Sequence, residues 1–131
     1  MNIPFACVFV ALLLIYVPKI AMFAAATSEP GGYDNRHPRV QQSRLSGLGA
    51  RATGAHLNGF EAFAPFAVAV IFAQAAHVDP IWITRLCIAH VVFRAIYIGL
   101  YLGDVSALRS TVWGLSFAAT SGLFLFAICG N

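Results

Sequence analysis

The stretch Ile3–Ala26 reads IPFACVFVALLLIYVPKIAMFAAA and contains a single charged side chain, that of Lys19. An α-helix needs about 20 predominantly apolar residues to cross the hydrocarbon core of a bilayer, so this stretch is long enough to span it. Three further apolar stretches follow at about 52–76, 81–102 and 107–129. None alternates between apolar and polar residues as a membrane β-strand does. We therefore expect four transmembrane helices.

The composition agrees with a membrane protein. Of 131 residues, 60% are hydrophobic and 10% are charged, and the mean hydropathy is +0.78. Soluble domains are roughly one-quarter charged, and a chain this short cannot bury so much apolar surface in a soluble core. The sequence predicts one domain, residues 1–131, folded as an all-α four-helix transmembrane bundle. The net charge of +3 without a basic run argues against a nucleic-acid partner.

The connection at 27–50 predicts the orientation of the chain. It holds Arg36, Arg39 and Arg44, and Arg109 follows the third connection on the same side of the membrane. The opposite side has a single arginine near the second connection. By the positive-inside rule we expect the long loop in the cytoplasm and both termini outside. The proline and glycine content of the loop argues against a further helix there.

A secretory signal peptide is the alternative reading of the first span. Its length, and its interruption by Pro18 and Lys19, favour a membrane helix instead. The three cysteines, Cys7, Cys87 and Cys129, all fall within predicted spans. We interpret them as small apolar residues and expect neither a disulfide framework nor a metal site.

Charged side chains inside the spans indicate where function resides, because such groups are costly in lipid. Arg51, Asn58 and Glu61 are spaced seven and three residues apart, which places them on one face of the second helix. If Arg51 lies at the cytoplasmic edge, Glu61 is roughly 15 Å deeper, near the bilayer midplane.

The third predicted helix carries a matching stripe. His90, Arg94, Tyr97 and Tyr101 are spaced four, three and four residues apart. Arg94 would lie roughly 12 Å from the cytoplasmic end, at a depth similar to that of Glu61. We expect these opposite charges to meet, directly or through a bound ligand. A purely structural ion pair that fixes helix register is the alternative.

More polar groups surround Glu61 and Arg94 than a structural ion pair between helices requires. Tyr97 and Tyr101 add hydroxyl groups, Asn58 adds an amide, and Arg51 and Arg109 add cations at the cytoplasmic end. Together they predict a polar cleft for an anionic, hydrogen-bonding ligand.

Several of these segments resemble the MAPEG superfamily, the membrane-associated proteins in eicosanoid and glutathione metabolism. The second span reads RATGAHLNGFEAFAPF at 51–66 and resembles the family's second-helix signature. The third reads RAIYIGLYLG at 94–103 and is followed by LRS at 108–110, which is similar to the family's third helix and fourth-helix entry. The loop sequence GYDNRHPR at 32–39 resembles that of the short bacterial members.

This resemblance implies a homotrimer of four-helix bundles in the bacterial inner membrane, with active sites between subunits on the cytoplasmic side. It implies a glutathione transferase or peroxidase that acts on apolar electrophiles or lipid hydroperoxides arriving from the bilayer. Arg109 resembles the arginine that stabilises the glutathione thiolate, and Lys19 resembles basic residues at the cytoplasmic end of the first helix. The residues that resemble glutathione contacts are Arg51, Asn58, Glu61, Arg94, Tyr97 and Tyr101.

Two positions depart from the pattern of glutathione-using relatives. Gly54 stands where those relatives carry an arginine, and Ala62 stands where leukotriene C synthase carries a tyrosine. These losses favour an alternative, a non-catalytic lipid-binding or scaffold protein. A small proton-coupled exporter is a third hypothesis. Against it, Glu61 lies in the second span rather than the first and has Arg94 as a partner.

Overall fold

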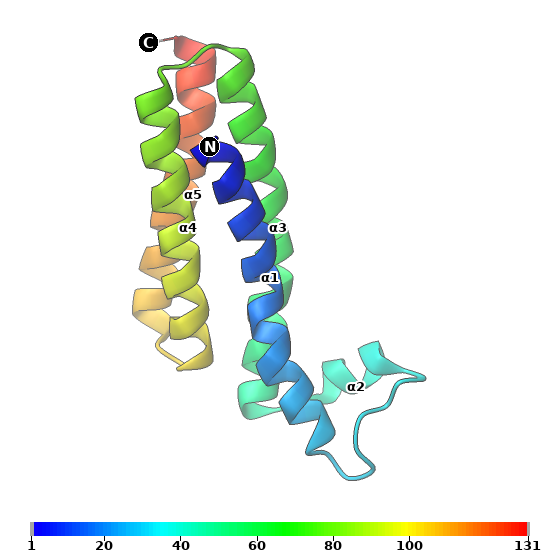
Figure 1. The fold of residues 1–131 in the computed structure, drawn as a ribbon. Coiled ribbons are helices and arrows are strands. Elements are labelled where there is room, and N and C mark those ends of the chain that lie inside the picture. The colour runs from blue at the N-terminus through cyan, green and yellow to red at the C-terminus, as the bar shows by residue number, and fades with distance from the viewer. Residues whose placement is uncertain (1, 131) are drawn as a thin grey trace.

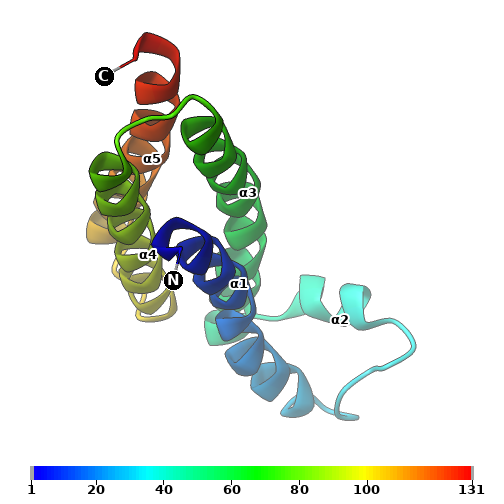
Figure 2. The ribbon, with the colours of Figure 1, turned by 45° about the horizontal axis from the view of Figure 1, so that its top comes forward.

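The computed structural model describes residues 2–130, and in this range it contains five helices and no strand. Four of the helices are long and apolar enough to cross a membrane, which confirms the predicted all-α membrane fold. They lie side by side as a bundle, and the short helix α2 projects from one end of it (Figures 1 and 2). The helices are α1 (Ile3–Thr27), α2 (Pro38–Arg44), α3 (Gly47–Ala75), α4 (Pro80–Leu102) and α5 (Ser106–Cys129).

The two ends of the bundle differ. One end carries the α1–α3 connection and the turn between α4 and α5, and we call it the loop end. The chain termini lie toward the opposite end (Figure 1). At that opposite end, the Asp79 carboxylate accepts a hydrogen bond of 2.8 Å from the backbone N–H of Ile81 and so caps α4. Pro80 occupies the first turn of α4, where its missing N–H leaves no donor unpaired.

Helix α1 packs most extensively against α3. Gly59 makes this possible, since a Cβ there would lie 3.3 Å from the Cα of Ile15. Pro18 lies inside α1 and cannot donate to the carbonyl one turn before it. The buried His56 approaches the adjacent carbonyl, with its Nδ1 2.6 Å from the oxygen of Ile15. A neighbouring helix thus supplies a polar partner to the backbone where lipid offers none.

The connection between α1 and α3 corrects the expectation of a helix-free loop, because α2 forms within it. Pro38 takes the first turn of α2, a position that suits its fixed φ and absent N–H. Helix α3 also begins at Gly47, before the expected start at Ala52. Gly49, within the segment expected to be a loop, is buried against α1.

Gln41 of α2 holds the connection in place. Its Nε2 donates to the carbonyl oxygens of Ala26 and Gly32 at 3.1 and 2.8 Å, and its Oε1 accepts from the N–H of Asp34 at 2.9 Å. The Asp34 carboxylate accepts from the backbone N–H groups of His37 and Arg36, and these bonds hold its pKa below the usual range. The segment is therefore ordered by its own hydrogen bonds.

Candidate functional site

The polar stripes of α3 and α4 meet through a chain of hydrogen bonds. Nη1 of Arg94 donates to Oδ1 of Asn58 at 3.0 Å, and Nδ2 of Asn58 donates to Oε2 of Glu61 at 2.9 Å. Within residues 2–130, Arg94 and Glu61 form no direct ion pair. The asparagine amide is therefore the group that joins the two charges.

The two charged ends of this chain sit in different surroundings. Arg94 is only 4% exposed, and its Nη2 has no hydrogen-bond partner in the described part of the chain. Glu61 is the middle residue of α3 and is exposed. A carboxylate that faces lipid at mid-span is costly. This face of α3 therefore favours a covering group, either a polar ligand or another protein chain.

Two arginines cap a pair of tyrosine rings beside this chain. The guanidinium carbon of Arg94 lies 4.3 Å from the ring centroid of Tyr97, and that of Arg109 lies 4.4 Å from the ring centroid of Tyr101. The two rings meet edge to face, with centroids 5.5 Å apart. Because Arg109 belongs to α5 and the tyrosines to α4, the cation–π contact between Arg109 and Tyr101 joins the polar residues of these two helices.

Two cavities adjoin these residues. The deep cavity has a volume of about 160 Å³ and the loop-end cavity one of about 220 Å³. Asn58 and Trp113 line both, so the two form one cleft between α3 and α5. The other residues of the loop-end cavity are Tyr97, Tyr101, Arg109 and Ser110. The other residues of the deep cavity are Glu61, Ala62, Pro65, His90, Arg94, Ser116, Phe117 and Thr120.

His90 forms the buried floor of the deep cavity. Its ring stacks on Phe66 with centroids 3.8 Å apart and an interplanar angle of 3°. Its Nδ1 lies 2.9 Å from the hydroxyl of Thr120 and 3.2 Å from that of Ser116. These contacts join α3, α4 and α5 at one level, which keeps the floor rigid.

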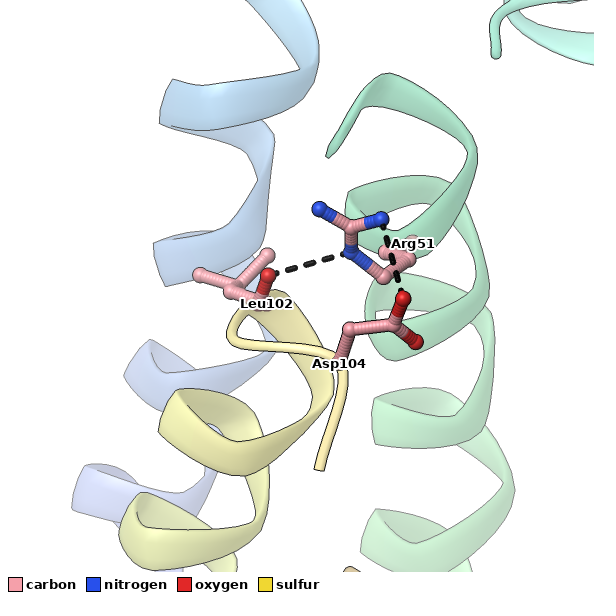
Figure 3. A network of polar contacts seen from close by, with 3 residues as sticks. All are labelled: Arg51, Leu102 and Asp104. Carbon is pink, nitrogen blue, oxygen red and sulfur yellow. Dashed lines mark hydrogen bonds and ion pairs between the residues drawn. The ribbon is translucent and has the colours of Figure 1, made fainter. Parts of the chain in front are cut away.

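Arg51 points away from the cleft. Its Nε donates to the backbone oxygen of Leu102 at 3.1 Å, and its Nη1 lies 3.5 Å from a carboxylate oxygen of Asp104 (Figure 3). It is not among the residues that line either cavity. Arg51 therefore ties α3 to the turn that leads into α5 and to Arg109.

The structure explains the glycine at position 54. A Cβ at Gly54 would collide with the hydroxyl group of Tyr101. The tyrosine thus rests on α3 in the space that a larger side chain would occupy. The observed position of the Tyr101 ring therefore requires a glycine at position 54.

Sequence reasoning brought together Asn58, Glu61, Arg94, Tyr97, Tyr101 and Arg109, and the structure places all six around the cleft. It missed the wall that α5 contributes, which consists of Trp113, Ser116, Phe117 and Thr120. Their spacing of three or four residues, with two hydroxyls in an apolar span, was the available signal. Among residues 2–130, no group of three or more His, Cys, Asp or Glu side chains could hold a metal ion.

Comparison with known proteins supplies one result. Residues 3–129 match the MAPEG family, which is nearly the whole chain. No curated protein and no solved structure matches the chain.

Proposed function

The chain belongs to the MAPEG family, and on that premise we propose that it is a membrane-bound glutathione transferase or peroxidase. The observation that carries the proposal is the divided cleft between α3 and α5. One cavity is lined by Arg109 and two tyrosines, and the other combines polar groups with an apolar wall of Ala62, Pro65, Trp113 and Phe117. A thiol-bearing peptide and an apolar electrophile need such neighbouring but chemically different sites.

The loop-end cavity suits glutathione. Arg109 offers a cation, Tyr97 and Tyr101 offer hydroxyl donors, and Asn58 offers an amide. Glu61 lies beyond Asn58, where the cleft continues into the deep cavity; it is exposed at mid-span, hydrogen-bonded to Asn58 and suited to the peptide's ammonium group. Arg94 also lines the deep cavity, and its Nη2 has no partner among residues 2–130, which leaves donor capacity of the kind that a carboxylate satisfies.

Arg109 is the proposed catalytic residue. Glutathione supplies a thiol, whose ionised form is the nucleophile. A thiol with a pKa of about 8.5 is mostly protonated at neutral pH, and an adjacent guanidinium stabilises the anion. The stacking of Arg109 on Tyr101 fixes the cation where Ser110 and the two tyrosines surround the cavity.

The deep cavity suits the electrophile. Its volume of about 160 Å³ is close to that of an engineered apolar cavity of roughly 150 Å³ that holds benzene. Trp113 and Phe117 form one wall and are 44% and 59% exposed, so this wall is open to the bilayer side. We infer a substrate with a single ring or a short chain that enters from lipid, with a lipid hydroperoxide as the reducible counterpart.

Assembly and orientation follow as parts of the proposal. A homotrimer would cover the exposed Glu61 of each α3 at a subunit boundary, which removes the cost of facing lipid. The loop end, with its arginines, would face the cytoplasm, where glutathione can reach Arg109 from water. Arg51 frames the site by holding the turn before α5.

The test is Arg109→Ala in purified protein, assayed with glutathione and 1-chloro-2,4-dinitrobenzene. We expect conjugation at neutral pH to fall by more than about tenfold, because the thiol returns to a pKa of about 8.5 and is mostly protonated. Stabilisation of the fold by glutathione should persist. Arg85→Ala, which removes an exposed cation near Trp82 of α4, is the matched control and should retain activity. Equal loss of binding and conjugation in Arg109→Ala would contradict the assigned role.

A second candidate is a lipid-binding protein of the same fold without catalysis. The filling of the Gly54 position by Tyr101 and the small side chain of Ala62 favour it, because both reduce the polar contacts available to glutathione. A titration distinguishes the two functions. Thermal stabilisation at millimolar glutathione supports the transferase, whereas no shift supports the binding protein.

A further inference from the structure

A third cavity lies outside the cleft, between α1 and the segment that contains α2. Its volume is about 220 Å³, and Lys19 of α1 lines it. Within residues 2–130, Lys19 makes no ion pair. Lys19 also lies about two turns before the end of α1, inside a span that has no other charge. A lysine there needs an anionic partner or water, since an isolated charge in lipid is costly.

The cavity is part polar and part apolar. Met22, Phe23 and Ala26 supply an apolar wall from α1, while Tyr33 and Gln42 add a hydroxyl and an amide from the connection. No carboxylate is among the described residues that line it. Glu29 and Asp34, the acidic residues of the connection, line a separate cavity with Arg44. The local charge at Lys19 is therefore positive and uncompensated.

The cavity is also preformed. Gln41 fixes the connection to the carbonyl oxygen of Ala26, at the edge of the cavity. The ring of Tyr33 packs on that of Phe23, with centroids 5.1 Å apart. A tyrosine held between an apolar helix face and a polar segment is typical of the headgroup level of a membrane. A ligand at this place meets donors at one end and lipid-facing side chains at the other.

From these observations we propose that this cavity binds one anionic phospholipid. Its phosphate would lie between the Lys19 ammonium and the donors of Tyr33 and Gln42, and its acyl chains would run along α1. The exposed side chains of Ile20 and Phe23, which are 75% and 55% exposed, provide the apolar track for the chains. Arg39, whose Nη1 donates to Oε1 of Gln42 at 3.4 Å, adds positive charge beside the cavity. The proposal is independent of chemistry in the α3–α5 cleft.

Native mass spectrometry of the full chain, reconstituted with equal amounts of phosphatidylglycerol and phosphatidylcholine, tests it. Wild type should retain phosphatidylglycerol in preference to phosphatidylcholine. Lys19→Gln should reduce that preference about five- to tenfold, the effect of one cation near the membrane surface. Lys19→Arg should restore it, which separates lost charge from misfolding. Arg85→Gln, which removes a cation from the other end of the bundle, should leave the preference unchanged.

Three results would overturn the proposal. The first is equal retention of both lipids by wild type, and the second is an unchanged preference in Lys19→Gln. The third is displacement of the lipid by sn-glycerol 3-phosphate, which would show that a soluble phosphate compound is the ligand. Glutathione is measured in parallel, because Lys19 also resembles a family position near glutathione. Loss of glutathione stabilisation in Lys19→Gln, with the lipid preference intact, would assign Lys19 to the peptide instead.

Discussion

Helix α3 has two faces that pack in opposite ways. Toward α1 the backbones approach closely, and a Cβ on Gly59 would lie 3.3 Å from the Cα of Ile15. Toward α5 a cavity of about 160 Å³ remains between the helices. Lipid offers little hydrophobic drive for helix association, so small residues and close van der Waals contact hold the first face together. The second face keeps polar groups that need space for a ligand. One helix thus separates the structural interface from the candidate site.

The largest expected effect is that of a larger residue at Gly59, which tests whether the α1–α3 face is packed more tightly than the α5 side of α3. In Gly59→Leu the new side chain meets the Cα of Ile15, which cannot move aside as a side chain can, as well as the Ile15 side chain. We expect α1 and α3 to separate at a cost of about 3 kcal/mol, the upper range for overpacking. The measurement is the apparent melting temperature in detergent, with the fraction of monodisperse protein. Gly99→Leu is the matched control, because a Cβ at Gly99 meets nothing within 4 Å. Equal loss in both variants would show that α1–α3 packing is not special.

Enlarging a residue on the other face should have the reverse outcome. Ala62 lines the deep cavity, so the added methyl groups of Ala62→Leu have that space to occupy. We expect stability to change by less than about 1 kcal/mol, because the cavity accepts the added volume. Affinity for a single-ring electrophile should fall about tenfold, which corresponds to about 1.4 kcal/mol. Isothermal titration and a melting curve on the same sample measure both effects.

Ala64→Leu provides the control for this change. Ala64 is exposed on α3 and does not line the deep cavity, so both stability and affinity should stay near wild type. Unfolding of Ala62→Leu, with Ala64→Leu unaffected, would mean that the α3–α5 face is packed as tightly as the α1–α3 face.

The division between the two faces was only partly predictable from the sequence. The four spans followed from apolar length, and the stripes of α3 and α4 followed from helical spacing, because both are local properties of the chain. Helix α2 was missed because its proline and glycine neighbours indicated a loop, whereas Gln41 stabilises the segment through contacts distant in sequence. The contacts of Arg51 were not predictable for a similar reason, since its partners are Leu102, at the end of α4, and Asp104, in the turn after it.

The α5 wall was missed because Trp113 and Phe117 resemble the aromatic residues of any membrane helix, and two hydroxyls in an apolar span are a weak signal. Trp113 and Phe117 are recognised as cavity residues only once the space between α3 and α5 is known. The Gly54 position illustrates the same limit. Its sequence signal was a lost arginine, and only the structure relates it to the Tyr101 hydroxyl.

That relation can be tested by a double-mutant cycle, with a smaller expected effect. Gly54→Ala adds a Cβ where the Tyr101 hydroxyl lies, so the ring has to move and Arg109 loses its stacking partner. In the Tyr101→Phe background the closest contact is removed, and the nearest remaining ring atom is 3.0 Å from the added Cβ. We expect a coupling free energy of about 1 kcal/mol in apparent stability, with activity reduced in Gly54→Ala and partly restored in the double variant. Strictly additive effects would show that the two residues are independent.

The smallest expected effect concerns Arg51, which holds the loop end of the cleft. Its ion pair with Asp104 is 3.5 Å long, and the two side chains are 30% and 70% exposed. Exposed pairs of this kind contribute about 0.5 kcal/mol and weaken with salt. Arg51→Gln removes both the ion pair and the bond to the Leu102 carbonyl, whereas Asp104→Asn removes the ion pair alone. If Arg51 acts by positioning the turn before Arg109, Arg51→Gln should lower kcat more than it lowers glutathione affinity. Asp104→Asn should cause part of the same loss of kcat, and added salt should reduce the difference between Asp104→Asn and wild type. A loss of glutathione affinity confined to Arg51→Gln would instead make Arg51 a direct ligand, and the cleft would then extend to the loop end of α3.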